Sequence, residues 1–157
     1  MQLLLKKIHP EVKLPERAYS NSVGLDLSAF LLTEAGGSNS VLIPPGVVKS
    51  IPTGLFFGGI LDLGSVTPHR PFLAVCSRSG LAERGLFVAN APGIVDPDYR
   101  GEIKVLLANV SYTSHYIRHG DRIAQAVVTA YGTPDIVEVE ALEPTERGEK
   151  GFGSSGR

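Results

Sequence analysis

Glycine and proline divide this chain into short segments. Its 157 residues include 18 glycines and 11 prolines, about 18% of the chain against an average near 12%. Both residues mark turns and interrupt helices, so the composition argues against long helices and favours short strands joined by turns. The hydrophobic fraction of 43% can form a packed core, which excludes a disordered chain. The length suits one domain.

Short apolar runs between the turn residues are the predicted strands. They recur about every ten residues, a spacing typical of a sandwich, barrel or jelly roll. One short helix is expected around residues 80–84, ended by Gly85. A polar loop is expected over Gly58 to Arg70, and Pro52-Thr53-Gly54 is expected to end the second strand. The predicted strands are residues 41–43, 47–51, 72–75, 103–107, 123–129 and 136–140, the last with the apolar and acidic alternation of a half-buried strand.

Charge and cysteine content exclude several classes of function. Fifteen Lys and Arg against sixteen Asp and Glu give a net charge of −1, whereas a duplex-binding domain is expected to be basic. The single cysteine, Cys76, excludes an intramolecular disulfide and a site built on several thiolates. No apolar run approaches a membrane span, and the N-terminus has the reverse of a signal-peptide pattern. A soluble, intracellular protein is expected.

The C-terminal tail allows two interpretations. From Arg147 the sequence is RGEKGFGSSGR, with Phe152 as its one apolar side chain, so it cannot order itself by burial. It is either a frayed terminus or an arm that orders over a ligand. Its G-x-G-x-x-G spacing is not a dinucleotide fingerprint, because no strand precedes it and no helix follows. Gly-permitted backbone N–H groups can nonetheless bind an anion, and Arg147 suits phosphate.

Three internal segments carry candidate chemistry. Arg78 and Ser79 open the short helix, which fits either a phosphate site or an ordinary N-cap beside a surface arginine. Asp96 and Asp98 are either turn formers or a general base and its neighbour. Gln125 lies in an apolar run, where a buried amide needs partners.

Other reactive residue types are set aside. His115 and His119 have the spacing of paired metal ligands on a helix, but the flanking residues argue against a helix. Cys76 is expected to be a small core residue, not a nucleophile.

Five collinear segments together resemble the motifs of the trimeric dUTP pyrophosphatases (dUTPases). They cover nearly the whole chain and occur in the family's order. The resemblance favours the functional interpretation of the segments above over the structural one. The segments are Ala18 to Ala29, Arg78 to Ala82, Gly93 to Glu102, Gly120 to Val127 and Arg147 to Gly156.

This resemblance implies a fold and a reaction. The fold would be an all-β, distorted jelly roll of the β-clip type, assembled as a homotrimer with a β domain (1–146) and a flexible arm (147–157). The arm would close over a neighbouring subunit's active site. The enzyme would hydrolyse dUTP to dUMP and pyrophosphate, preventing uracil incorporation into DNA and supplying dUMP for thymidylate synthesis. Mg²⁺ would be bound through the triphosphate and water, with no direct protein ligand.

The resemblance also assigns roles to individual residues. Asp96 would orient the water that attacks the α-phosphorus and would contact the deoxyribose, and Tyr99 would pack beneath the sugar and reject UTP. Asp26 and Asp121 would be supporting carboxylates that orient arginines or waters around the metal. The residues that would bind substrate are Arg78, Ser79, Gly80 and Gln125 at the phosphates; Asn90, Gly93, Ile94, Val95 and Lys104 at the base; and Arg147, Phe152, Gly153 and Ser154 in the arm.

Two rival functions remain at this stage. A dCTP deaminase shares the fold, but deaminating members use a glutamate base, and the Asp96 and Tyr99 pair with the Phe152 arm favours the dUTPase. A nucleotide-gated binding protein on the same scaffold is the second rival. The loop over residues 58–70 is longer than in compact members and is a candidate site for an extra partner. The compartment is not specified beyond soluble and intracellular, being the cytoplasm, or the nucleus of a host cell if the source is viral.

Overall fold

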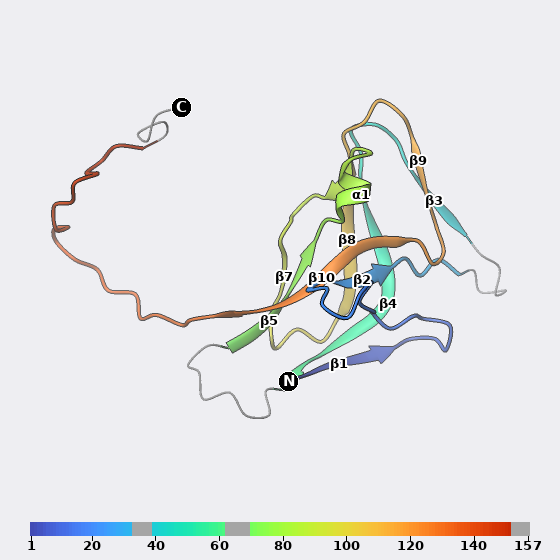
Figure 1. Ribbon diagram of the computed structural model, residues 1–157, viewed down its shortest axis with the longest axis horizontal. Coiled ribbons are helices and arrows are strands. Elements are labelled where there is room, and N and C mark those ends of the chain that lie inside the picture. Colours follow the sequence, from blue (N-terminus) through green and yellow to red (C-terminus); the bar gives the residue numbers. More distant parts are fainter. Residues whose placement is uncertain (33–38, 62–69, 152–157) are drawn as a thin grey trace.

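Strands dominate the computed structural model, which describes residues 1–32, 39–61 and 70–151 (Figure 1). Every strand pairing in it is antiparallel. The strands are β1 (Gln2–Lys7), β2 (Leu25–Ser28), β3 (Ser40–Ile43), β4 (Val48–Leu61), β5 (Arg70–Cys76), β6 (Leu86–Val88), β7 (Gly93–Val95), β8 (Glu102–Asn109), β9 (His115–Arg118) and β10 (Arg122–Tyr131), and the one helix of the described residues is α1 (Ser79–Ala82).

The strands form two four-stranded sheets and a two-stranded ribbon. One sheet has the order β1-β4-β8-β6, the other has the order β2-β10-β5-β7, and β3 pairs with β9. Buried side chains of both larger sheets belong to a single apolar cluster, which includes Phe57 and Val105 from the first sheet and Leu73 and Ile123 from the second. The all-β prediction is therefore confirmed, and the core lies between the sheets that carry the candidate site.

Four of the predicted strands, over residues 41–43, 72–75, 103–107 and 123–129, are present as β3, β5, β8 and β10, each extended at one or both ends. The short helix is present as well, and Gly85, with φ of +80°, follows it. A side chain at Gly85 would press against Ser111, so the turn after α1 requires glycine both for its conformation and for its packing.

The expectation that Pro52-Thr53-Gly54 ends a strand is wrong, because β4 continues to Leu61. The register against β8 shifts between Pro52 and Phe56, so the turn residues form a bulge inside the strand. Two contacts hold this bulge: the Thr53 hydroxyl donates to the Ile103 carbonyl at 2.6 Å, and the Gly54 N–H donates to the Glu102 carboxylate at 2.9 Å. The predicted loop is consequently shorter, since Gly58 to Leu61 belong to β4. Residues 62–69, where the extra partner was predicted, lie outside the described residues.

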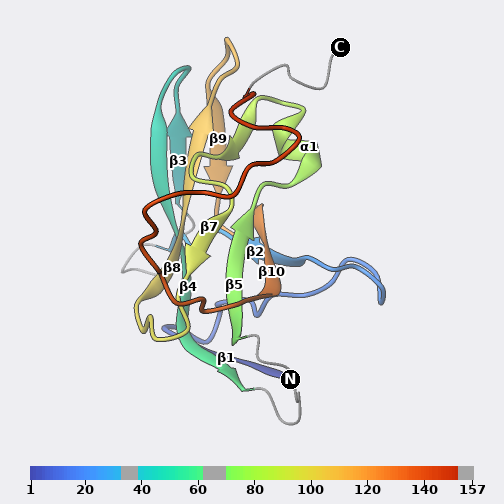
Figure 2. The same ribbon diagram turned by 90° about the vertical axis from the view of Figure 1, so that its left-hand side faces the viewer.

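The predicted half-buried strand over residues 136–140 is also wrong. Residues 132–151, the part of the C-terminal segment that the structure describes, contain no strand, and they extend away from the body (Figures 1 and 2). Ile136 is 99% exposed, Val137 72% and Val139 58%. An alternating pattern forms a strand only where a surface covers its apolar side, and the described part of the chain offers none. We call residues 132–146 the connecting segment.

No helix of the described residues is long and apolar enough to cross a membrane.

Candidate active site

Three of the sequence motifs meet in the second sheet because β10 lies between β2 and β5. In the register of these strands, Gln125 is opposite Asp26 on one side and opposite Cys76 on the other. Arg78 follows two residues after Cys76, at the N-cap of α1. Antiparallel pairing thus brings together residues that are up to 99 positions apart in the chain.

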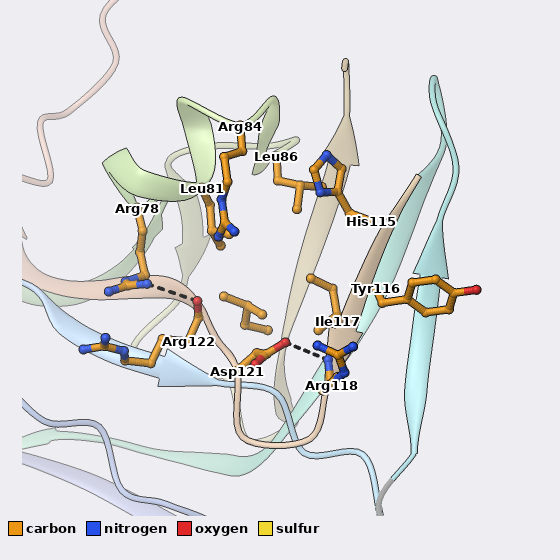
Figure 3. A pocket seen from close by; sticks show the side chains of 11 residues that line it. Arg78, Leu81, Arg84, Leu86, His115, Tyr116, Ile117, Arg118, Asp121 and Arg122 are labelled. Carbon is orange, nitrogen blue, oxygen red and sulfur yellow. Dashed lines mark hydrogen bonds between the residues drawn. The ribbon is translucent and has the colours of Figure 1, made fainter. Parts of the chain in front are cut away.

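Asp26 binds two arginines. Its Oδ1 accepts a hydrogen bond from Arg78 Nε at 2.8 Å, and its Oδ2 lies 3.1 Å from Arg122 Nη1. Arg78 also donates from Nη1 to the Arg122 carbonyl at 3.2 Å (Figure 3). The Asp26 side chain is only 17% exposed, and a half-buried carboxylate with two guanidinium partners fixes both side chains in place. Asp26 therefore orients arginines, while its part in the reaction stays a prediction.

Gln125 has the partner that its apolar surroundings require. Its Nε2 donates to the Ser77 carbonyl at 2.8 Å, directly before Arg78. A side chain at Gly24 would collide with the Gln125 amide, which explains why the first motif has glycine there. Gly80 differs, because a Cβ at this position would have no neighbour within 4 Å. The packing of the described chain gives no reason for a glycine at that position, which leaves open space beside Ser79.

The turn that joins β7 and β8, two strands of different sheets, forms a second site. We call it the hairpin pocket; it has a volume of about 210 Å³ and is lined by Ile94, Val95, Asp96, Tyr99, Glu102, Ile103 and Lys104. The Tyr99 N–H donates to the Asp96 carbonyl at 3.0 Å, and the Arg100 guanidinium donates to the carbonyls of Pro97 and Tyr99. All of these contacts are accepted by backbone oxygens. The Asp96 carboxylate is exposed and has no hydrogen-bond partner among the described residues.

The ring of Tyr99 is fixed in the hairpin pocket. Its hydroxyl donates to the Glu102 carbonyl at 3.0 Å, and a Cβ on Gly101 would collide with the ring. The Glu102 carboxylate accepts from Gly54 and lies 3.7 Å from Lys104 Nζ. The sequence analysis missed this role of Glu102, although the residue ends the third motif. Arg122 was not among the predicted site residues either, although it pairs with Asp26.

The remaining predicted residues lie at the edges of these groups. Asp121 accepts the Arg118 N–H at 2.7 Å and so holds the turn before β10. Asn90 lies beside Gly93 in the turn before β7. Arg147 is exposed and donates from Nε to the Lys150 carbonyl at 3.0 Å. Phe152, Gly153 and Ser154 lie outside the described residues.

The two histidines with the spacing of paired metal ligands have ordinary structural contacts. His119 Nδ1 accepts the Leu31 N–H at 3.0 Å, and His115 Nε2 lies 3.0 Å from the Ser111 hydroxyl. The two histidines are not on a helix, as expected, and the described residues contain no cluster of three or more His, Cys, Asp or Glu. Cys76 is a half-buried free thiol at the end of β5.

The residues around Asp26 and the residues of the hairpin pocket line separate pockets. Arg78 and Arg122 line a pocket between α1, β9 and β10, which shares no lining residue with the hairpin pocket. One group offers guanidinium groups and the other a free carboxylate beside an aromatic ring.

Comparison with known proteins identifies the family. The dUTPase family model matches residues 10–156, which is most of the chain and includes all five motifs. The chain belongs to the dUTPase family.

Named relatives agree with this assignment along the whole length. The deoxyuridine 5'-triphosphate nucleotidohydrolase of Nautilia profundicola is 42% identical, with all of both chains covered. That of Wolinella succinogenes is 40% identical and covers 100% of this chain and 95% of its own. Among solved structures, the dUTPase of Staphylococcus bacteriophage 80alpha with dUPNHPP has a TM-score of 0.76 and 25% identity, covering 99% of each chain. The fold predicted from the motifs, a dUTPase-like all-β fold, is confirmed.

Proposed function

We propose that this chain hydrolyses dUTP to dUMP and pyrophosphate. Curated relatives of about 40% identity are named as deoxyuridine 5'-triphosphate nucleotidohydrolases, and a similar phage dUTPase was solved with dUPNHPP. The observation that carries the proposal is the Asp96 carboxylate, which is exposed at the hairpin pocket with no partner among the described residues. A carboxylate in that state can accept a hydrogen bond from an attacking water.

Hydrolysis of this phosphoanhydride depends mainly on positioning the water and the triphosphate and on neutralising the triphosphate charge. Water, oriented by Asp96, attacks the α-phosphorus; its oxygen forms the new P–O bond, the bond from the α-phosphorus to the bridging oxygen breaks, and pyrophosphate leaves with that electron pair. The proton of the water passes to Asp96 or to solvent. Arg78, Ser79, Gly80 and Gln125 hold the phosphates, where the arginine fixed by Asp26 offers a preorganised positive charge.

Selectivity for deoxyuridine comes from the hairpin pocket. Tyr99 packs beneath the deoxyribose, and its ring, held by Gly101 and the Glu102 carbonyl, leaves no room for a 2′-hydroxyl. The backbone from Asn90 to Val95 pairs with the uracil edge, and Lys104 lies near the base. A site that bonds specific polar groups rejects analogues that leave those groups unpaired.

We further propose that the active unit is a homotrimer with shared sites. The residues that hold the phosphates come from one copy, the hairpin pocket comes from a second copy, and the arm (147–157) comes from a third. The separation of the two pockets within one chain and the exposure of the connecting segment support this arrangement. Arg147 then reaches the γ-phosphate, Phe152 stacks on the uracil, and Gly153 with Ser154 completes the closure.

Mg²⁺ suits this site as a cofactor carried by the substrate. Asp26 is the carboxylate nearest to the residues that hold the phosphates, and its two oxygens already bind Arg78 and Arg122. The ion would therefore be held through the triphosphate and water, and Asp26 and Asp121 would orient arginines or waters around it. When bound, the ion neutralises triphosphate charge. Because dUTP is an intracellular metabolite, the enzyme acts in a soluble intracellular compartment, the cytoplasm, or the nucleus of a host cell if the source is viral. There it lowers dUTP, limits uracil incorporation into DNA and supplies dUMP for thymidylate synthesis.

The direct test is pyrophosphate release from dUTP with purified protein and Mg²⁺, with UTP, dTTP and dCTP as matched controls. The expected result is release from dUTP far above the three controls. Ammonia from dCTP with dUTP intact would instead identify a deaminase, and nucleotide binding without turnover would identify a binding protein.

A further inference from the structure

The ladder between β4 and β8, which lie side by side in Figure 1, is interrupted beside the hairpin pocket. The register shifts so that residues 52–56 of β4 lie opposite residues 102–104 of β8. An inserted stretch of this kind takes backbone groups out of the ladder. The start of β8 lines the pocket through Glu102, Ile103 and Lys104, and it must be held against β4 by other contacts.

The Glu102 carboxylate supplies one of those contacts. Its Oε1 accepts the Gly54 N–H at 2.9 Å, which ties the start of β8 to the bulge of β4. Gly54 is buried, and a buried N–H that loses its acceptor is costly. The Glu102 side chain is only 15% exposed, so water has little access to take the place of either partner.

The bulge to which Glu102 bonds is a fixed anchor. Gly54 has φ of +70°, and a Cβ at this position would collide with Val12 and Phe30, so its backbone packs directly against them. The Gly54 carbonyl also accepts the Ile8 N–H at 3.0 Å. Because Val12 belongs to the core and is 2% exposed, the Glu102 carboxylate is bound to a point that the core holds in place.

The backbone of the same residue holds the aromatic ring of the pocket. The Glu102 carbonyl accepts the Tyr99 hydroxyl at 3.0 Å. One residue therefore connects the anchor in β4, through its side chain, to the ring of Tyr99, through its carbonyl. The second carboxylate oxygen lies 3.7 Å from Lys104 Nζ, and this pair contributes little because the lysine side chain is 56% exposed.

We propose that Glu102 is a positioning residue that determines the selection of deoxyribose. Its carboxylate acts without touching the substrate: by bonding to Gly54 it fixes the start of β8, and with it the carbonyl that holds the Tyr99 ring. The proposal rests on the proposed function, in which this ring rejects a 2′-hydroxyl. When the carbonyl is free to move, the ring makes room for the 2′-hydroxyl of UTP, and selectivity falls.

Three substitutions at Glu102 separate reach from charge. The quantity measured is kcat/KM for dUTP divided by kcat/KM for UTP, a ratio that does not depend on how much of the enzyme is folded. Glu102→Ala removes the bond to Gly54 and should lower the ratio about fivefold, the value of one hydrogen bond. Glu102→Asp keeps the charge but is one methylene too short, and it should cause a similar loss. Glu102→Gln keeps the length and an acceptor oxygen, so the ratio should stay within about twofold.

A double-mutant cycle tests the route through Tyr99. Tyr99→Phe alone should also lower the ratio about fivefold. If Glu102 acts through this ring, Glu102→Ala combined with Tyr99→Phe should lower the ratio little further than either change alone, whereas independent effects would multiply to about 25-fold.

Leu107→Ala controls for general destabilisation. Leu107 is a fully buried core residue of the same strand and is not among the residues that line the hairpin pocket. Its truncation leaves a cavity and weakens the fold, but the ratio should not change.

Several results would overturn the proposal. They are an unchanged ratio in Glu102→Ala, effects of Glu102 and Tyr99 that multiply, and a ratio lowered equally by Leu107→Ala. An equal loss in Glu102→Gln would assign the effect to the ion pair with Lys104 and would overturn it as well. Equilibrium binding of dUPNHPP and its ribose counterpart gives a selectivity ratio without turnover. Failure of the unmodified chain to hydrolyse dUTP, with this binding ratio still lowered in Glu102→Ala, would count against the proposed function alone.

Discussion

Apolar side chains are buried in the body of the chain and exposed in the connecting segment. In the body, Phe57 and Ile123 are 1% and 0% exposed and belong to one core cluster. In the connecting segment, Ile136 and Leu142 are 99% and 86% exposed. Both regions alternate apolar and polar residues, so the pattern alone does not decide burial. The difference indicates that the body folds on its own contacts, whereas the body leaves the apolar side chains of the segment after Tyr131 uncovered.

The largest expected effect concerns chemistry performed by the body. Asp96→Asn should lower kcat by about 10²–10⁴-fold, because the amide cannot act as the base for the attacking water. Affinity for dUTP should change little, and steady-state kinetics with equilibrium binding measure the two quantities separately. Asp98→Asn, in the same turn, is the matched control. Unchanged turnover in Asp96→Asn would remove this residue from the mechanism.

Unfolding measurements should show that the body contributes to stability and the arm does not. Phe57→Ala should lower the free energy of unfolding by about 3–5 kcal/mol, since it leaves a cavity in the core. A chain ending at Glu146 should unfold like the full chain in urea but lose activity on dUTP. If this truncation destabilised the body as much as Phe57→Ala, the arm would be a structural element of the fold.

A smaller effect is expected from the aromatic residue of the arm. Phe152→Ala should weaken the closed complex with nucleotide by about 1–3 kcal/mol, the usual contribution of a ring stacked on a base. Trypsin cleavage after Arg147 and Lys150 reports closure, and a nucleotide should slow this cleavage in the unmodified chain more than in the variant. Equal protection of both forms would argue against stacking.

The smallest effect should come from a contact that lies wholly within the body. Tyr99→Phe removes the hydrogen bond to the Glu102 carbonyl and should reduce the preference for dUTP over UTP by about 1 kcal/mol, or roughly fivefold. Protection of the arm should not change. Gly101→Ala, which displaces the same ring, should reduce the preference further. Retention of full selectivity in both variants would mean that the ring position does not determine sugar choice.

Most of the body could be predicted from the sequence, because its signals are local. The runs over residues 72–75, 103–107 and 123–129 are short, apolar and bounded by turn residues, and they form strands. The bulge in β4 was not predictable, since it depends on Thr53 and Gly54 bonding to residues about 50 positions away. For the same reason Glu102 was missed: its carboxylate acts on a strand that the sequence places far from it.

The candidate site shows a similar division. The motif order predicted the association of Asp26, Arg78 and Gln125, and the sheet order β2-β10-β5 explains it. The strand predicted over residues 136–140 is absent because alternation does not specify what covers the apolar side. The proposed roles of Arg147 and Phe152 would depend on contacts with another copy of the chain, and they stay predictions.

The central claim is that each site combines the hairpin of one copy with the arm of another. Co-assembly of equal amounts of Asp96→Asn chains and chains ending at Glu146, each inactive alone, tests it most directly by dUTP hydrolysis. If hairpin and arm come from different copies, random assembly leaves both intact in roughly a quarter of the sites, and about that fraction of the normal activity should return. Activity no higher than that of the two separate variants would contradict the account.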